Sequence, residues 1–525
     1  MRALDLMLVT GVLAAGLWAS AARAAEFASV EEMDKYVTAQ AAQDLDILKN
    51  LKPRELYAAP DGKPENPGTK DAPIDLKTAL TDAAKVTAGT LVWVKGGKYA
   101  VGKLQQNKAM KGTREKPIII RAVPGERATV LGEINLGGDH LWLWGLETSG
   151  PPASGVNVYA PCDGIKVINC VLHDHGAAAR PEKRLPTGHG IGGWDFGSDH
   201  EFYGNLIYWN GWNWLDHGFY SQNQPKHAPK RYVDNVVFEN SGWGFHLYGS
   251  APYHYGYYLE GNVAFATSLI PRGTEAGAPQ GNILVGGHKA TRCVILRKNI
   301  GYQPKAAESK RCVDIGYTDG PNYNILVEDN YFMGGINAFE LRQTAQAVVR
   351  RNTFWAPNGM VVAAIIPPDQ AETALAKTSA DPKSMLDLQK IDFKKFGVTF
   401  EGNRYVDNGK FDLEKFRAAT KTAQTDQIVP GKDGRPAGVA VFKRVNRYEP
   451  DRVHLTLFNW PKDAVVELDL GDVLRPGDKY RIVDVHDIWG APALEGTYAG
   501  GPVKLNMTGT WAPEFGSYVL FRPAR

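Results

Sequence analysis

TGHGIGGWDFGSDHEFYGNLIYWNGWNWLDHGFYSQN occupies residues 187–223, and KRYVDNVVFENSGWGFHLYG follows at residues 230–249. Three short strand-like runs in this stretch open after glycine: IGGWDF, GFYSQN and GFHLYG. Each is followed by a second run with an asparagine: FYGNLIYW, YVDNVVFE and YLEGNVAF. Paired β-runs that recur in this way are typical of a repeat solenoid.

The same pattern extends along the chain from LWLWGLE to VTFEGNRY. Its asparagines are Asn169, Asn205, Asn235, Asn262, Asn299, Asn330, Asn352 and Asn403, with separations of 36, 30, 27, 37, 31, 22 and 51 residues. Coils of this length with irregular insertions predict a parallel β-helix. Because asparagine tolerates the left-handed backbone conformation and hydrogen-bonds to the next coil, we expect it at one corner of every coil.

Composition narrows the class of protein. The 525 residues suggest two or three units or one elongated repeat architecture. A hydrophobic content of 43% with 22% charged residues is typical of a globular chain. The net charge of +3 gives no support for a partner that is a nucleic acid or an anionic membrane.

The first 24 residues have the pattern of a secretory signal peptide. Arg2 precedes an apolar run, and Ala22-Arg23-Ala24 forms the cleavage motif. We therefore expect a secreted or periplasmic protein without a membrane anchor. In an oxidising compartment Cys162–Cys170 or Cys293–Cys312 can pair, and buried free thiols are the alternative.

We expect an all-β chain with five segments. They are a signal peptide (1–24), an N-terminal helical and linker segment (25–85), a parallel β-helix (86–408), a connector (409–437) and an antiparallel β-sandwich (438–525). A charged insertion at 367–395 has helical composition. The β-sandwich is expected either to bind sugar or to cap the last coil.

The segment from about Leu91 to Asn408 resembles the right-handed parallel β-helix proteins related to pectate lyases. The resemblance rests on the asparagine-marked coils and on the pattern TLVWVKGGKY…KPIIIRAVPGE…HLWLWGLE. It implies a carbohydrate-active protein, but lyases, glycosidases, epimerases and phage spikes share this architecture. Relatives often use calcium held by acidic residues on the outer face. No cluster of three aspartates is visible here, which weakens the expectation of Ca²⁺.

Alternation along the strands predicts which side chains face outward, because successive side chains of a strand point to opposite faces. The apolar residues expected inside are Ile191, Phe219, Phe245, Leu247, Ile283, Val313, Ile315, Phe339 and Leu341. One outward row is Gly192, Tyr220, His246, Leu284, Asp314 and Glu340. A second is Trp194, Gln222, Tyr248, Gly286, Gly316 and Arg342. Polar and aromatic residues on one face predict a groove, and the resemblance implies that glycans bind on this face.

Five residues of these rows are the candidate catalytic groups. His246 and Tyr220 are expected to act as base and acid. Asp314 and Glu340, on adjacent coils, form a candidate carboxylate pair for glycoside hydrolysis. Arg342 is a candidate partner for a uronate carboxylate. The alternatives are a structural histidine, an aromatic stack, and an ion pair between the carboxylates and Arg342.

Further residues are candidates for substrate binding, namely Trp194, Gln222, Tyr248, Asp195, His217 and His254. Trp212, Trp214 and Trp243 can stack on sugar rings or pack in the core. His173, Asp174, His175 and His189 have a metal-like arrangement, but their spacing matches no strict zinc signature, and we expect no metal there.

The leading hypothesis is an exported enzyme that cleaves a uronic-acid-containing polysaccharide by β-elimination. Arg342 or Gln222 would engage the carboxylate while His246 and Tyr220 move protons. Hydrolysis by Asp314 and Glu340 is a second mechanism. C5-epimerisation and non-catalytic glycan binding are further alternatives.

Overall fold

The computed structural model describes residues 27–150, 154–176, 188–249, 254–268, 280–304, 311–317, 322–363 and 397–523. The expected signal peptide and the insertion at 367–395 lie outside these residues. Among the described residues, the model contains no helix with the length and apolar character needed to cross a membrane.

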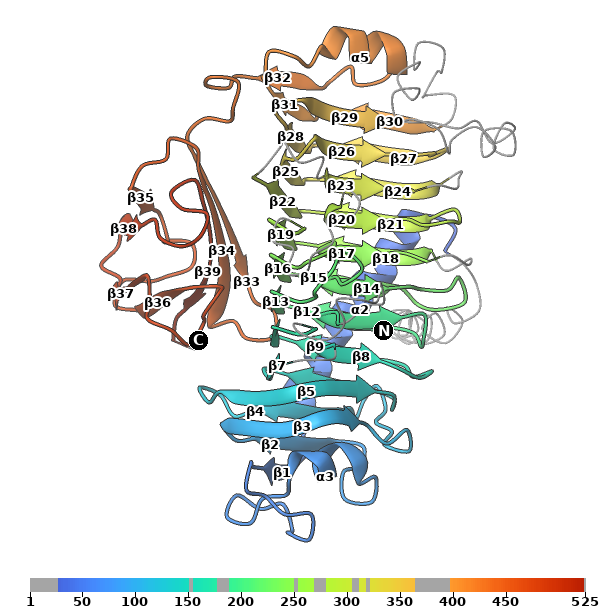
Figure 1. The fold of residues 1–525 in the computed structure, drawn as a ribbon, viewed down its shortest axis with the longest axis vertical. Coiled ribbons are helices and arrows are strands. Elements are labelled where there is room, and N and C mark those ends of the chain that lie inside the picture. Colours follow the sequence, from blue (N-terminus) through green and yellow to red (C-terminus); the bar gives the residue numbers. More distant parts are fainter. Residues whose placement is uncertain are drawn as a thin grey trace, which may run out of the picture.

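The central unit is a parallel β-helix with three strand columns (Figure 1). The first column consists of β1 (Arg54–Ala58), β2 (Thr90–Val94), β4 (Ile118–Ala122), β6 (Leu141–Trp144), β9 (Lys166–Ile168), β12 (Glu201–Tyr203), β15 (Lys230–Val233), β18 (Tyr255–Glu260), β21 (Arg292–Arg297), β24 (Tyr323–Glu328), β27 (Ala347–Arg350) and β30 (Val398–Glu401). Since β1 pairs with β2, the parallel sheet begins within the segment 25–85 that was expected to be helix and linker.

The other two columns belong to one continuous sheet. The second consists of β7 (Glu147–Ser149), β10 (Val171–His173), β13 (Leu206–Tyr208), β16 (Val236–Phe238), β19 (Val263–Phe265), β22 (Ile300–Gln303), β25 (Tyr331–Gly334), β28 (Thr353–Trp355), β31 (Arg404–Val406) and β32 (Gln427–Val429). The third consists of β8 (Val156–Val158), β11 (Ile191–Trp194), β14 (Phe219–Ser221), β17 (Phe245–Leu247), β20 (Gly281–Val285), β23 (Arg311–Ile315), β26 (Asn337–Leu341) and β29 (Gly359–Ala363). The long strands β3 (Gly97–Gln105) and β5 (Ala128–Leu136) join them.

A ladder of buried asparagine side chains runs along one corner. The Nδ2 of Asn205 donates to the Oδ1 of Asn235 at 2.9 Å, and the same bond recurs through Asn262, Asn299, Asn330 and Asn352 to Asn403. The left-handed residue is the one before each asparagine: Gly204, Asp234, Gly261, Lys298, Asp329, Arg351 and Gly402. The expectation of left-handed asparagines is therefore wrong for these seven. They occupy the corner because their amides link successive coils.

Asn169 departs from the ladder by one residue. It adopts the left-handed conformation itself, with a φ of 51°. Cys170 then occupies the ladder position, where its backbone N–H donates to the Oδ1 of Asn205. The Asn169 amide instead bonds to Glu449 of the C-terminal domain at 2.9 Å.

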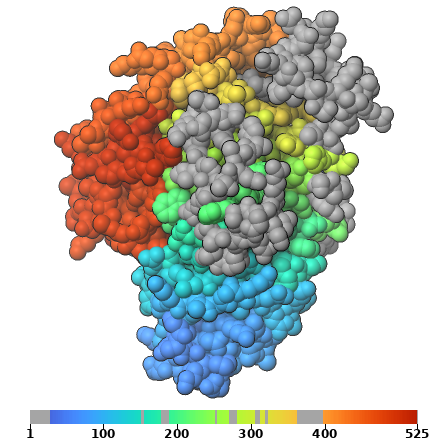
Figure 2. Space-filling model, in the orientation of Figure 1, coloured from blue at the N-terminus to red at the C-terminus, as the bar shows by residue number. Residues whose placement is uncertain are grey.

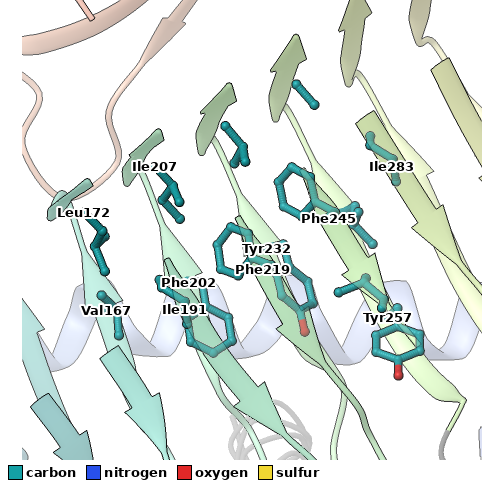
Figure 3. Packing of buried hydrophobic residues seen from close by; sticks show 14 of the residues in the cluster. Val167, Leu172, Ile191, Phe202, Ile207, Phe219, Tyr232, Phe245, Tyr257 and Ile283 are labelled. Atoms are coloured by element: carbon teal, nitrogen blue, oxygen red, sulfur yellow. The ribbon is translucent and has the colours of Figure 1, made fainter. Parts of the chain in front are cut away.

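The interior is a continuous apolar core (Figure 3). The residues expected inside, from Ile191 to Leu341, are fully buried. Two short helices lie at its ends: α3 (Leu76–Thr81) near the first coils and α5 (Leu413–Thr420) on the last. Phe416 of α5 packs against Phe400 and Tyr405 of the final coils. The four cysteines are buried and form no disulfide with one another, which agrees with the thiol alternative.

Helix α2 (Val30–Asn50) packs along the outer face of the first column. Met33 is fully buried in that contact. Asp44, near the other end of the helix, is 2% exposed and forms ion pairs with Lys166 and Arg231. A carboxylate at this depth needs such partners to offset the loss of hydration.

The C-terminal domain packs on the second column (Figures 1 and 2). It is a small antiparallel sandwich in which one sheet contains β33 (Val439–Val445), β34 (Arg452–Asn459), β39 (Phe515–Phe521), β36 (Lys479–Asp484) and β37 (Leu494–Thr497), and the other contains β35 (Val465–Leu468) and β38 (Val503–Asn506). Phe458 and Phe515 lie against Tyr302, with ring centroids 5.2 and 4.7 Å apart. The domain therefore lies alongside the coils, and α5 rather than this domain covers the last coil.

Candidate functional site

The third column carries the outward rows expected from the sequence. The register aligns Gly192, Tyr220, His246, Leu284, Asp314 and Glu340 on successive strands. Helix α2 and the C-terminal domain pack on the other two columns. The rows thus occupy the column whose outer face neither of these elements covers.

The second row departs from expectation at its first member. A bulge in β11 follows Gly192 and places Trp194, which has a φ of 21°, opposite Ser221 instead of Gln222. The indole still reaches the first row, since the centroids of Trp194 and Tyr220 are 5.0 Å apart.

Six rings from neighbouring coils form the histidine–aromatic cluster, which consists of His189, Trp194, His217, Tyr220, His246 and Tyr248. The centroids of His246 and His217 are 4.1 Å apart, and those of His246 and Tyr248 are 4.6 Å apart with nearly parallel planes. Tyr220 lies 5.5 Å from His246 by the same measure. The structure thus brings together five of the candidates named from the sequence: His246, Tyr220, Tyr248, Trp194 and His217.

His246 is the ring in the middle of the cluster. Its side chain is half-buried, and its Nδ1 is a buried nitrogen without a hydrogen-bond partner. Burial, with a smaller effect of His189 and His254, holds the pKa of His246 well below the ordinary value of 6.5. The imidazole is therefore neutral at pH 7, so one of its two nitrogens carries a lone pair.

Tyr220 precedes His246 in the first outward row. Its Oη accepts a hydrogen bond from the Nε2 of Gln222 at 3.3 Å. Burial raises the pKa of Tyr220 above 10, although the bond from Gln222 opposes this. The phenol is therefore a proton donor over the neutral pH range.

Four residues further along the column form the carboxylate–arginine cluster: Arg311, Asp314, Glu340 and Arg342. The Nε of Arg342 donates to Glu340 at 2.9 Å, and a guanidinium nitrogen of Arg311 lies 3.1 Å from Asp314. Burial and then the neighbouring Glu340 raise the pKa of Asp314 to about 7. Burial also acts to raise the pKa of Glu340, but Arg342 and Arg311 outweigh it and lower that pKa below 4.5.

The two clusters are distinct. Leu284, 1% exposed, separates them in the first row. With about 4.8 Å between coils, His246 and Asp314 are roughly 10 Å apart along the axis. Tyr317, missed by sequence reasoning, lies beside the first cluster, with its ring centroid 5.6 Å from that of Tyr248.

Other candidates have structural partners. Asp195 accepts a bond from Gln224 at 2.8 Å, and His254, 2% exposed, bonds to the carbonyl of Gly249. His173 bonds to Glu147 and Asp174 on the side that faces the C-terminal domain. Within the described ranges, no group of three or more His, Cys, Asp or Glu residues is arranged to hold a metal ion.

Lys230 is a buried residue that sequence reasoning missed. Its ammonium group contacts the carbonyl oxygens of Gly193, Trp194 and Gln222, the last at 2.6 Å. It thereby holds the bulge that turns Trp194 toward Tyr220. The sequence does contain a signal for this. Residues two apart in a strand point to the same side, and Tyr232 faces the core, so the charged Lys230 must point inward as well.

Comparison with known proteins gives local sequence similarity and a shared architecture. No family model matches the chain. A pectate lyase of Emericella nidulans, PEL9, is 35% identical over 80 residues. That match covers 15% of this chain and 18% of the relative, so the chain spans less than a fifth of the length of the curated relative it matches.

Solved structures with a similar architecture have low identities. Pectate lyase Pel9A is 17% identical with a TM-score of 0.37, and covers 62% of this chain and 80% of its own. A mannuronic-acid-specific family 6 lyase from human gut microbiota is 13% identical with a TM-score of 0.39, covering 72% and 92%. At these values the comparisons carry no argument about the reaction. The parallel strand columns themselves confirm the expected pectate-lyase-like β-helix architecture.

Proposed function

We propose that this protein is an exported polysaccharide-active enzyme that cleaves a uronic-acid-containing polymer by β-elimination at the histidine–aromatic cluster. The observation that carries the proposal is His246. It presents a neutral imidazole with an unpartnered nitrogen among aromatic rings on an outward strand column. A buried nitrogen without a partner costs about 1–3 kcal/mol, and such groups are typical of functional sites.

The proton transfers of the reaction fit these residues. In β-elimination a base removes the proton at C5, the electron pair of that bond forms the C4=C5 double bond, and the C4–O bond breaks. The leaving oxygen then takes a proton. His246 in its neutral form accepts the first proton, and the hydroxyl of Tyr220, whose pKa is raised, supplies the second.

Of the two partners expected for the uronate carboxylate, Gln222 is better supported than Arg342. Arg342 is bound to Glu340 and lies 3.9 Å from Asp314, so its charge is already balanced. Gln222 lies beside Tyr220 and is the better placed amide donor. We therefore assign carboxylate recognition to neutral donors near the base.

Among the described residues of this column, no donor set fits calcium. Ca²⁺ prefers six to eight oxygen ligands, several of them carboxylates. Here Asp314 and Glu340 share two guanidinium groups instead. No step of the proposed reaction is routed through a metal.

The local similarity to a pectate lyase and the secretory pattern of residues 1–24 agree with this proposal. A second candidate is hydrolysis at the carboxylate–arginine cluster. It is favoured by one observation: the pKa of Asp314 is raised to about 7 while that of Glu340 is lowered, which separates an acid from a base. Against it, both carboxylates have arginine partners.

A panel of polyuronates and neutral glycans tests the proposal. Elimination generates unsaturated ends that absorb in the ultraviolet, whereas hydrolysis gives new reducing ends without that absorbance. Epimerisation changes the sugar composition without shortening the chain. Binding without any of these products would contradict the proposed enzyme and favour a non-catalytic glycan-binding protein.

A further inference from the structure

Two histidines in the cluster each accept the same kind of hydrogen bond from a backbone N–H. The N–H of His217 donates to the Nδ1 of His189 at 3.1 Å, and the N–H of Trp243 donates to the Nδ1 of His217 at 3.0 Å. The three residues have equivalent places in the repeats HGI, HGF and WGF, just before the glycine that opens each strand. Each of the two histidine rings therefore accepts a bond from the next coil.

The glycine in this repeat leaves no space for a side chain. A Cβ on Gly218 would lie 2.5 Å from Val237 and 2.6 Å from the carbonyl of Gly244. This close packing fixes the backbone on which His217 sits. The ring therefore has a defined position relative to the N–H of Trp243.

The backbone bonds determine where each ring carries its proton. An Nδ1 that accepts a hydrogen bond has no proton of its own, so the neutral ring is protonated at Nε2. Protonation of Nδ1 would oppose two N–H groups and break the bond. His189 and His217 are 3% and 2% exposed, and the hydrogen bonds of these two rings to other described residues all involve Nδ1 rather than Nε2.

We infer that His189 and His217 are fixed, neutral N–H donors that bind two oxygen atoms of the glycan, and that they act as neither bases nor metal ligands. The rings are parallel within 2° and their centroids are 5.4 Å apart. The two N–H donors are therefore on successive coils and point in the same direction. This spacing suits separate oxygens of a ligand that lies along the column. The inference deepens the proposed function by naming donors that recognise the substrate.

The division of labour within the cluster follows. An Nε2 that carries a proton has no lone pair for a metal or for a substrate proton. Of the three imidazoles, His246 alone has an Nδ1 without a backbone donor. The single base and the two donors are thus distinguished by backbone bonds rather than by residue type.

Matched variants test the roles of Nδ1 and Nε2 of each ring separately. His217→Asn and His189→Asn keep an oxygen that can accept the backbone N–H but lose the distal donor. His217→Gln keeps a distal N–H and loses the acceptor. We expect the Asn variants to melt near the wild type and to bind an oligogalacturonide about tenfold or more weakly, because a donor to a sugar oxygen is missing. We expect His217→Gln to retain more affinity and to lose more stability.

The tautomers are measured directly by ¹⁵N NMR of the full chain with labelled histidine, with the two signals assigned from the Asn variants. Neutral Nε2–H rings at both positions are expected, and an Nδ1–H ring or an imidazolium at pH 7 would overturn the inference. Unchanged affinity in both Asn variants would also overturn it. If the wild type neither binds nor cleaves any polyuronate, the proposed function fails, and the NMR result alone decides the tautomers.

Discussion

His246 lies in register with Tyr220 on the neighbouring strand, and the centroids of their rings are 5.5 Å apart. This pairing places a neutral imidazole and a protonated phenol on one face of adjacent coils. The two groups have opposite roles in proton transfer because burial lowers the pKa of the first and raises that of the second.

His246→Gln is expected to reduce kcat by at least about 100-fold, the usual contribution of a general base. The substitution keeps a polar side chain of similar length, so the melting temperature should change little. Turnover of a polyuronate, followed by ultraviolet absorbance, measures the effect. His140→Asn, on an early coil at a left-handed position that Asn tolerates, is the matched control and should retain activity. Full activity in His246→Gln would exclude His246 as the base.

The pH profile provides an independent measurement. A base must be unprotonated, so activity is lost only when the pH falls through the pKa of His246. Because that pKa lies well below 6.5, kcat/KM should remain high in mildly acidic buffer. An acidic limb centred at or above pH 6.5 would show that another group controls the reaction.

Asp314→Asn and Glu340→Gln distinguish the two mechanisms. Hydrolysis at this pair requires both carboxylates and predicts that either substitution abolishes turnover. Elimination at His246 predicts that turnover survives both substitutions. Stability should fall more in Glu340→Gln than in Asp314→Asn, because Glu340 pairs with both Arg311 and Arg342 whereas the Asp314 carboxyl, with a pKa of about 7, is already partly neutral. Product analysis and denaturant unfolding of the same variants measure both effects.

The rows on the third column were predictable from the sequence. Alternation along each strand indicates which side chains face outward, and the asparagine repeat indicates how successive coils align. The left-handed residue of each corner was predicted one position too late. The asparagines are placed by their ladder bonds, such as that of Asn205, rather than by their backbone propensity. The bulge that moves Trp194 depends on Lys230, which is distant in sequence. The protonation of His189 and His217 depends on backbone donors from other coils. Such long-range bonds leave little trace in local sequence.

The free energy of unfolding should decrease as the pH falls below neutrality. Burial keeps the pKa values of His189, His217 and His246 below 6.5 in the folded state. The unfolded chain then binds more protons, so the contribution of these rings is fully present above pH 6.5 and is lost as the pH falls below it. His217→Asn should reduce the slope of unfolding free energy against pH by up to about 1.4 kcal/mol per unit. An unchanged slope between pH 7 and 5 would contradict this.

The C-terminal domain should respond to pH in the opposite direction. His486 bonds to Asp484 of its own domain at 2.6 Å and to Glu239 of the β-helix at 3.3 Å. Although burial lowers the pKa of His486, these carboxylates raise it to about 9. Its contribution is therefore fully present below pH 6.5 and is lost as the pH rises through 9. The protection factors of β16 and β39, which correct for the intrinsic rise of amide exchange with pH, should fall as the pH approaches and passes 9, and His486→Gln should remove that step.

The asparagine ladder should be the most sensitive element of the coil stack. Asn262 donates to the carbonyl of Tyr232 at 2.8 Å and to Asn299 at 2.9 Å, and its oxygen accepts the amide of Asn235. Asn262→Ala leaves several buried groups without partners, so we expect a loss of about 3 kcal/mol or more in unfolding free energy. Asn50→Ala, at the exposed end of α2, should change it by less than about 0.5 kcal/mol. Equal effects of the two substitutions would mean that the buried ladder adds nothing to the stacking of the coils.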